Sequence, residues 1–152
     1  YQPGIATAAL AHAEYAELIP DLQHVDPGAI RTALRAIPRL YWVTDGTAAT
    51  GMPDGEYALG VQRVHKCLGC VRLESGSLAG SALTMDQALR NLVALGLALD
   101  DASNRVSRYP ADYLGLDDRG RVQPGAWADL VVMDHDLRVQ QVIVEGERIA
   151  LD

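Results

Sequence analysis

The sequence has no phenylalanine, no cluster of basic residues and no long apolar run. Thirteen basic residues stand against twenty acidic ones, and the formal charge of −7 leaves no basic patch to neutralise a phosphate backbone. Nucleic acid is therefore not expected as a partner. No apolar segment approaches the roughly 20 residues that a bilayer span needs, and the first residues lack the basic-then-apolar pattern of a signal peptide. We expect no membrane partner and a cytoplasmic location.

The chain also lacks a starting methionine, since it opens at Tyr1-Gln2-Pro3-Gly4. This opening suggests that the sequence begins inside a larger protein. With 49% hydrophobic residues among 152, there is enough apolar material for a core and length for about one domain. The composition is typical of a soluble, globular protein.

Two cysteines, Cys67 and Cys70, follow His65 closely and raise the question of a metal or redox site. A structural zinc site needs four ligands and usually a second pair, which the sequence does not supply. A thioredoxin-like site would open a helix, whereas the surroundings here indicate a hairpin with Leu68-Gly69 in its turn. The pattern favours two small apolar residues beside a turn.

A short apolar run from Leu40 to Val43 leads to Thr44, Asp45 and Gly46. Its length and its Tyr, Trp and Val residues predict a buried strand. Parallel α/β folds place their chemistry at the carboxyl ends of strands. Asp45 is therefore either a catalytic carboxylate or a turn residue, because Asp is also favoured in turns.

The preceding residues complete a predicted strand, helix, strand unit. Residues 16–20 can form the first strand, with its proline near the end because proline donates no ladder hydrogen bond. Asp26-Pro27 indicates the start of a helix with Asp as N-cap, and Pro38 ends it. Such short connections are typical of a parallel sheet with a crossover helix.

Glycine and proline are frequent from Gly46 to Gly60, and a long loop is expected there. Residues 61–73 are predicted to form a hairpin. Residues 75–81 are expected to expose several backbone amides ahead of a helix, where small side chains let a ligand approach the main chain.

Helices are predicted in the next part of the chain. Thr84 and Gln87 have the spacing of a capping box, and the helix after them has an apolar face. That face consists of Met85, Ala88, Leu89, Leu92 and Val93. A further helix is predicted from near Asp100 to before Pro110, followed by one more helical turn that Gly115 closes.

Beyond Gly120 the pattern is that of strands. A buried strand is expected from Ala128 to Met133, and Gln141–Val144 is joined to residues 148–150 by a turn. These strands are too few to stand alone, which suggests that their partners lie upstream of Tyr1.

Five strings occur in order along the chain, and together they carry a family resemblance. They are Val43–Ala48, Gly76–Met85, Arg90–Val93, Tyr109–Leu116 and Gly120–Val132. The set resembles the N-acetylglucosamine-6-phosphate deacetylases of the amidohydrolase superfamily. The last string alone, with its Pro-Gly-x-x-Ala-Asp-Leu pattern, resembles many members of that superfamily, whereas the ordered set is far more specific.

The resemblance implies an α/β fold class, namely the carboxyl-terminal part of a (β/α)8 barrel plus strands of a small β-sandwich. Residues 1–115 would be the last strands and helices of the catalytic barrel, and residues 116–152 the carboxyl-terminal strands of the sandwich domain. A complete barrel takes around 250 residues, so the chain corresponds to its end only. The strand before His24 would be the seventh and the strand ending at Asp45 the eighth.

The resemblance also implies hydrolysis of the acetamide of N-acetylglucosamine 6-phosphate. In that family a divalent metal, zinc or iron, lowers the pKa of a bound water, and a carboxylate moves its proton to the departing amine. Asp45 matches that carboxylate. The family's metal ligands, a glutamate and two histidines, lie upstream of Tyr1, so no metal ligand is named in this chain and the fragment alone is expected to be inactive. Relatives are commonly homodimers, which is expected here too.

Substrate contacts are implied for two segments. The first is Asp21, Leu22, Gln23 and His24, with His24 at the sugar phosphate, and the second is a loop with Leu78, Ala79 and Gly80, which offers main-chain amides. The chain departs from the family where Tyr1 stands near an expected phosphate-binding arginine, and where Leu22 and Gln23 replace small residues. The alternatives are another amidohydrolase substrate, or a non-catalytic fragment or interaction piece.

Overall fold

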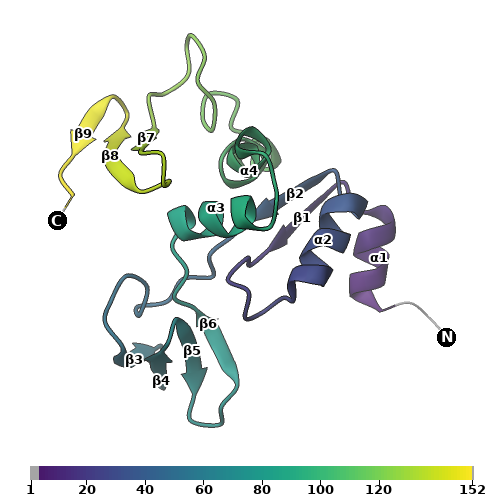
Figure 1. Ribbon diagram of the computed structural model, residues 1–152, viewed down its shortest axis with the longest axis vertical. Coiled ribbons are helices and arrows are strands. Elements are labelled where there is room, and N and C mark those ends of the chain that lie inside the picture. Colours follow the sequence, from purple (N-terminus) through teal and green to yellow (C-terminus); the bar gives the residue numbers. More distant parts are fainter. Residues whose placement is uncertain (1–3, 152) are drawn as a thin grey trace.

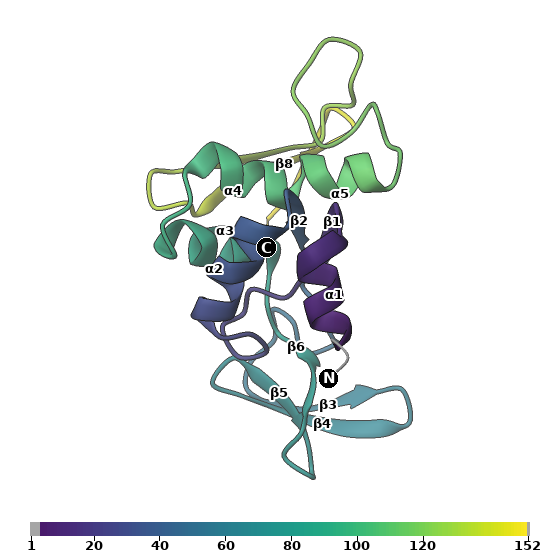
Figure 2. The ribbon, with the colours of Figure 1, turned by 90° about the vertical axis from the view of Figure 1, so that its right-hand side faces the viewer.

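The computed structural model describes residues 4–151 (Figure 1). In chain order its elements are α1 (Ile5–His12), β1 (Tyr15–Leu18), α2 (Pro27–Ala36), β2 (Arg39–Trp42), β3 (Gly55–Leu59), β4 (Gln62–Cys67), β5 (Cys70–Leu73), β6 (Leu78–Ser81), α3 (Met85–Ala94), α4 (Leu99–Val106), α5 (Arg108–Tyr113), β7 (Leu130–Met133), β8 (Val139–Val144) and β9 (Glu147–Ile149). The strands form three sheets, ordered β1-β2, β3-β4-β5-β6 and β7-β8-β9. The four-stranded sheet lies at one end of the molecule, and the three-stranded sheet lies beyond α3 and α4 toward the other (Figures 1 and 2).

The predicted strand, helix, strand unit is confirmed. β1 and β2 pair in parallel, with Leu18 opposite Trp42, and α2 connects them. The Asp26 carboxylate accepts a hydrogen bond of 2.7 Å from the N–H of Gly28, which caps α2 as expected. β2 ends earlier than predicted, at Trp42, and Asp45 lies in the loop that follows it.

The main hydrophobic core joins this unit to the helices after it. It consists of Ile30, Ala33, Ile37, Leu40, Trp42, Leu89, Leu92 and Ala102, from α2, β2, α3 and α4 and the residue after α2. Burial of one such large side chain stabilises by about 1.5–3 kcal/mol. Trp42 is 1% exposed, and its indole Nε1 finds no hydrogen-bond partner among the described residues. This core therefore anchors β2, the strand that precedes the loop of Asp45.

The expected long loop from Gly46 to Gly60 is wrong in its second half, because Gly55–Leu59 forms β3 and pairs antiparallel with β4. Gly60 occupies the turn between β3 and β4, with φ +59°. The hairpin predicted over residues 61–73 is confirmed as β4 and β5. The first half of the segment, before β3, stays irregular.

Residues 78–81 are also a strand, β6, and not the exposed loop that was expected. Ala79 is 8% exposed and packs with Val64 and Val71 in a small second core.

The helices are largely as predicted. Ala88, Leu89 and Leu92 of α3 are buried, and Gly115 follows α5 with φ +70°. The capping box is wrong: Thr84 is the N-cap of α3 without a side-chain capping bond, and Gln87 donates instead to Asn91 at 2.8 Å. Sequence patterns did not predict α1, which has no buried residue. None of the helices in residues 4–151 combines the length and apolar character that a membrane crossing requires.

The tail forms the three-stranded antiparallel sheet β7-β8-β9, close to the predicted positions. The expectation that its first strand is buried is wrong, since Val131 is 55% and Val132 46% exposed. An apolar run shows which side chains can be buried, but burial also requires another element packed against the strand. Within residues 4–151 this sheet is left partly exposed.

Arg105 supports β2 from the edge that β1 does not occupy. The N–H groups of Arg39 and Val43 donate toward β1, so the carbonyl of Leu40 between them faces the other edge. Arg105, 7% exposed, donates to that carbonyl at 2.8 Å from Nη1 and to Asp101 at 3.0 Å from Nε. The Arg105 side chain thereby supplies a hydrogen-bond donor to a buried backbone carbonyl of β2.

Replacing Arg105 by Leu should lower the free energy of unfolding by about 2–3 kcal/mol, because the Leu40 carbonyl then loses its charged donor. Urea denaturation measures the loss. Arg108→Leu is the matched control: its guanidinium is 55% exposed and lies 3.6 Å from Asp112, so its loss should stay below about 1 kcal/mol. Equal losses in both variants would show that the Leu40 bond contributes nothing.

Candidate functional site

Asp45 lies three residues beyond β2, at the carboxyl end of the parallel pair. Its backbone is left-handed, with φ +49°, a conformation that Asp tolerates better than most residues. Asp45 lines a pocket of about 710 Å³ whose other lining residues are Glu17, Leu18, Ile19, Val25 and Val43. Asp45 is therefore a turn residue by conformation that also lines a pocket at the carboxyl end of the parallel pair.

Ser81 of β6 holds this turn in place. Its N–H donates to the carbonyl of Asp45 at 2.7 Å, and its hydroxyl donates to the carbonyl of Thr44 at 2.6 Å. The same hydroxyl accepts the N–H of Leu83 at 2.8 Å, and Ser81 is 1% exposed. A single buried hydroxyl thus connects the Asp45 turn, the antiparallel sheet and the chain that enters α3.

Thr47 and Thr50 add to this connection, since both of their hydroxyls donate to the carbonyl of Ser81 at 3.3 Å. No role was assigned to the Ser81 hydroxyl from the sequence, and the two threonines were not singled out. Their partners are more than 30 residues away along the chain, so no local pattern marks them.

Gly80 lies against Asp45 and makes the contact possible. Its φ is +70°, and a Cβ at this position would lie 3.1 Å from the carbonyl oxygen of Asp45 and 2.6 Å from Cγ2 of Thr47. Glycine alone fits such an approach without strain. Of the three residues expected to contact substrate here, Gly80 lies beside Asp45, Leu78 is paired with Arg72 in the sheet, and Ala79 is in the second core.

Asp21 and His24 form a second ordered unit after β1. The Asp21 carboxylate accepts the N–H groups of Gln23 at 3.0 Å and His24 at 2.9 Å, and its other oxygen lies 2.7 Å from Nδ1 of His24. The Asp21 side chain is 7% and the His24 side chain 19% exposed. His24 is therefore an oriented imidazole and not a freely solvated one.

Leu22 sits between these two residues with φ +64° and is 38% exposed. A leucine in the left-handed region carries a cost of about 1–2 kcal/mol. The replacement of a small residue noted in the sequence thus falls on a position where the backbone conformation favours glycine or asparagine.

Burial raises the pKa of Asp21, but hydrogen bonds from the backbone of His24 and Gln23, and from the His24 ring, outweigh it. The pKa of Asp21 therefore lies below its ordinary value. The ionised carboxylate is the form that receives three donors and orients His24.

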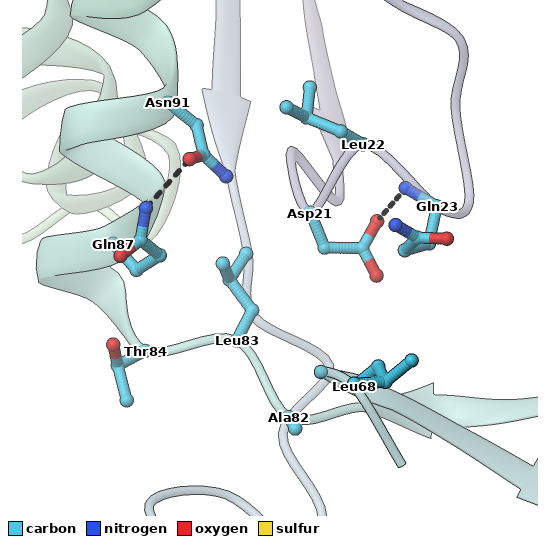
Figure 3. A pocket seen from close by; sticks show the side chains of 10 residues that line it. Asp21, Leu22, Gln23, Leu68, Ala82, Leu83, Thr84, Gln87 and Asn91 are labelled. Atoms are coloured by element: carbon cyan, nitrogen blue, oxygen red, sulfur yellow. Dashed lines mark hydrogen bonds between the residues drawn. The ribbon is translucent and has the colours of Figure 1, made fainter. Parts of the chain in front are cut away.

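Asp21, Leu22 and Gln23 line a second pocket, of about 350 Å³, shown in Figure 3. The other lining residues come from the β4–β5 turn, from the segment between β6 and α3, and from α3 itself: Leu68, Gly69, Ala82, Leu83, Thr84, Gln87 and Asn91. Its polar groups are a carboxylate, side-chain amides and a hydroxyl, which suit a ligand rich in hydroxyl groups. Neither Asp45 nor His24 is among them: Asp45 lines the 710 Å³ pocket, and His24 and Gly80 line neither of the two.

Gln87 and Asn91 were not named as site residues from the sequence. Asn91 donates to the carbonyl of Pro20 at 2.8 Å, which attaches α3 to the loop of Asp21. Its place in the Arg90–Val93 string was the signal that could have identified it.

No group of three His, Cys, Asp or Glu side chains within residues 4–151 is placed to hold a metal ion. The described side chains therefore do not fit a divalent metal site by themselves. The expected phosphate-binding position near Tyr1 and Pro3 lies outside the described residues.

Comparison with known proteins identifies the class. The profile described as the amidohydrolase family matches residues 29–149, and the chain belongs to that family. Amidohydrolases are in general metal-dependent hydrolases.

Three relatives indicate where in the family the chain lies. It is 40% identical over 150 residues to a putative N-acetylgalactosamine-6-phosphate deacetylase of Escherichia coli K12, covering 96% of this chain and 90% of that protein. It is also 40% identical to the N-acetylgalactosamine-6-phosphate deacetylase of Escherichia coli O157:H7, of which it spans 40%. The crystal structure of N-acetylglucosamine-6-phosphate deacetylase from Pasteurella multocida superposes with a TM-score of 0.90 at 32% identity, over 95% of this chain and 39% of that one.

Replacing Ser81 by Ala should destabilise the protein by about 1–3 kcal/mol, because the buried carbonyl of Thr44 and the N–H of Leu83 lose their partner. Urea denaturation measures this. Ser77→Ala, at an exposed serine on the same segment, should change stability by less than about 0.5 kcal/mol. A Ser81 variant as stable as the Ser77 variant would contradict the role given to the hydroxyl.

The depressed pKa of Asp21 predicts a pH dependence. Because the folded-state pKa lies below the unfolded one, the stabilisation is fully present above the unfolded pKa and is lost as pH falls through the folded pKa. Asp21→Asn should therefore be less stable than the wild type at pH 7, and the difference should shrink below about pH 4. Denaturation curves from pH 7 to pH 3 measure it, with Asp117→Asn, an exposed carboxylate, as control. A difference that is constant with pH would refute the ionic role.

Proposed function

We propose that this chain provides the acid/base and part of the sugar pocket of a metal-dependent deacetylase. The reaction is hydrolysis of the acetamide of N-acetylglucosamine 6-phosphate to glucosamine 6-phosphate and acetate. The observation that carries the proposal is the position of Asp45, held by Ser81 at the carboxyl end of two parallel strands. Strand ends of this kind carry catalytic groups in parallel α/β enzymes.

In this proposal residues 1–115 are the last strands and helices of a (β/α)8 barrel, and residues 116–152 are strands of a β-sandwich. Two features support it. β1 and β2 each pair on one edge only among the described strands, and a two-stranded parallel sheet is too small to stand alone. The tail forms a sheet of its own with exposed valines.

Asp45 takes a proton from the attacking water while the oxygen of the water bonds to the acetamide carbon. It then returns that proton to the sugar nitrogen as the C–N bond breaks, so that glucosamine 6-phosphate leaves as the amine and acetate carries the oxygen of the water. Ser81 contributes by fixing the main chain of Asp45, and Gly80 contributes by leaving room beside it, since a general base must lie within hydrogen-bond reach of the proton that it moves.

His24 is proposed to contact the sugar phosphate, because Asp21 orients its ring and it lies in the loop that follows β1. Asp21, Leu22 and Gln23 position that contact, and Gly80 together with Leu78 and Ala79 brings main chain near the sugar. Hydroxyl-binding groups in the 350 Å³ pocket support a carbohydrate ligand.

The divalent metal, zinc or iron, is proposed to be held by residues outside this chain, since residues 4–151 assemble no ligand set. The chain spans about two fifths of two of the relatives described above, which leaves room for those ligands elsewhere in the protein. We also propose that the protein is a homodimer and that it is located in the cytoplasm.

Two alternatives have specific support. Two relatives are named for the galactosamine substrate, which favours N-acetylgalactosamine 6-phosphate, the epimer at one sugar hydroxyl. The second alternative is a non-catalytic piece. The chain spans 90% of the Escherichia coli K12 relative, and residues 4–151 assemble no set of metal ligands.

Acetate release by the polypeptide that carries this chain, at its full natural length, tests the proposal. With N-acetylglucosamine 6-phosphate we expect turnover that a chelator abolishes, and Asp45→Asn should lower kcat by about 10²–10⁴-fold because the general base is lost. Asp117→Asn, at an exposed carboxylate, should retain activity.

Full activity of Asp45→Asn would disprove the assigned role. Faster turnover of the galactosamine epimer would favour the first alternative, and no release from either sugar with metal supplied would favour the second. Chelator-insensitive release would remove the metal from the proposal.

A further inference from the structure

Cys67 and Cys70 face each other across the β4–β5 hairpin. They are the last cross-strand pair before its two-residue turn, Leu68 and Gly69. Both are free thiols, Cys67 exposed and Cys70 half-buried. The interpretation of the two as apolar residues beside a turn therefore misses their accessibility.

Spacing in the ladder suits a disulfide. Directly opposed residues in an antiparallel pair have Cα atoms about 4.5–5.5 Å apart, within the 4.4–6.8 Å that disulfides span. Alternation places Cys67 and Cys70 on the same face as His65 and Arg72, the solvent face, because Val64 and Val71 on the other face are fully buried. The two cysteine side chains thus lie on the same face of the hairpin.

The turn between them is already constrained. Leu68 has φ +50° and Gly69 φ +80°, the signature of a type I′ hairpin turn, in which glycine and asparagine are preferred and leucine is not. The N–H of Leu68 donates to the Asp54 carboxylate at 3.1 Å. Leu68 itself is 87% exposed, so packing contributes little to holding its strained backbone.

We propose that Cys67 and Cys70 form a reversible disulfide that locks this turn. One cysteine thiolate attacks a disulfide oxidant such as oxidised glutathione, giving a mixed disulfide and one released thiolate. The other cysteine then attacks the protein sulfur of that mixed disulfide, forming the Cys67–Cys70 bond and releasing the second thiolate. The two cysteines lose two electrons and two protons, and the oxidant becomes two thiols.

Locking the turn acts on the pocket beside it. Leu68 and Gly69 line the 350 Å³ pocket together with Asp21, Leu22 and Gln23. Figure 3 shows Leu68 below Asp21 and Gln23. The oxidised hairpin holds this wall in one conformation, whereas the reduced hairpin lets it open. The pair is therefore a redox-sensitive element in the pocket wall, whatever ligand the pocket takes.

Incubating the intact protein with oxidised glutathione, alkylating the remaining thiols and measuring the intact mass tests the proposal. The expected product has lost two hydrogens and carries neither glutathione nor alkyl groups at these positions. Cys67→Ser and Cys70→Ser should each retain a glutathione adduct. Wild-type protein that keeps glutathione on either cysteine, or that is alkylated at both, would overturn the proposal.

A displaced pair provides the matched control. In the double variant Cys70→Ser, Arg72→Cys, the second thiol stays on the same face but lies diagonally from Cys67, at about 7–8 Å. This variant should close at least tenfold more slowly than the wild type. Equal rates would show that closure depends on chain proximity and not on the cross-strand geometry.

Hydrogen exchange reports the effect on the pocket wall. The amides of Leu68 and Gly69 should exchange more slowly in the oxidised than in the reduced protein, with no change at α2. Identical exchange in both redox states would refute the lock, even if the bond forms.

Discussion

The buried hydroxyl of Ser81 is the constraint on which the arrangement of the site depends. It connects the Thr44–Asp45 turn with Leu83 at the entry to α3, while the main chain of Ser81 bonds to Asp45 and Thr47. Because Ser81 is 1% exposed, these bonds have no competition from water, and losing one leaves a buried polar group unpaired. The parallel pair, the antiparallel sheet and α3 therefore keep one fixed relation at this residue.

Strained backbone positions gather around the two pockets. Among the described residues, five that are not glycine have positive φ, and three of them, Leu22, Asp45 and Leu68, line a pocket. Such conformations persist only where neighbouring contacts enforce them. Ser81 does so for Asp45, the Asp21 carboxylate does so around Leu22, and Asp54 bonds the amide of Leu68.

Local patterns predicted the elements whose stability is local. Asp26-Pro27 marked the start of α2, and Leu68-Gly69 marked a hairpin turn, since capping and turn chemistry act within a few residues. The same patterns failed for β3 and β6, where glycine-rich segments become strands because neighbouring strands pair with them. They failed for the burial of β7 as well, because burial depends on what covers a strand.

The sequence by itself determined the strand, helix, strand unit and the membership of the amidohydrolase family, and it singled out Asp45, whose catalytic role stays a prediction. Only the tertiary structure decided how Asp45 is held, that Gly80 must lack a side chain, and that Cys67 faces Cys70. The physical reason is the distance along the chain over which each interaction acts. Propensities and caps act between neighbours in the chain, whereas Ser81 bonds to a turn more than 30 residues away, and only folding brings the two together.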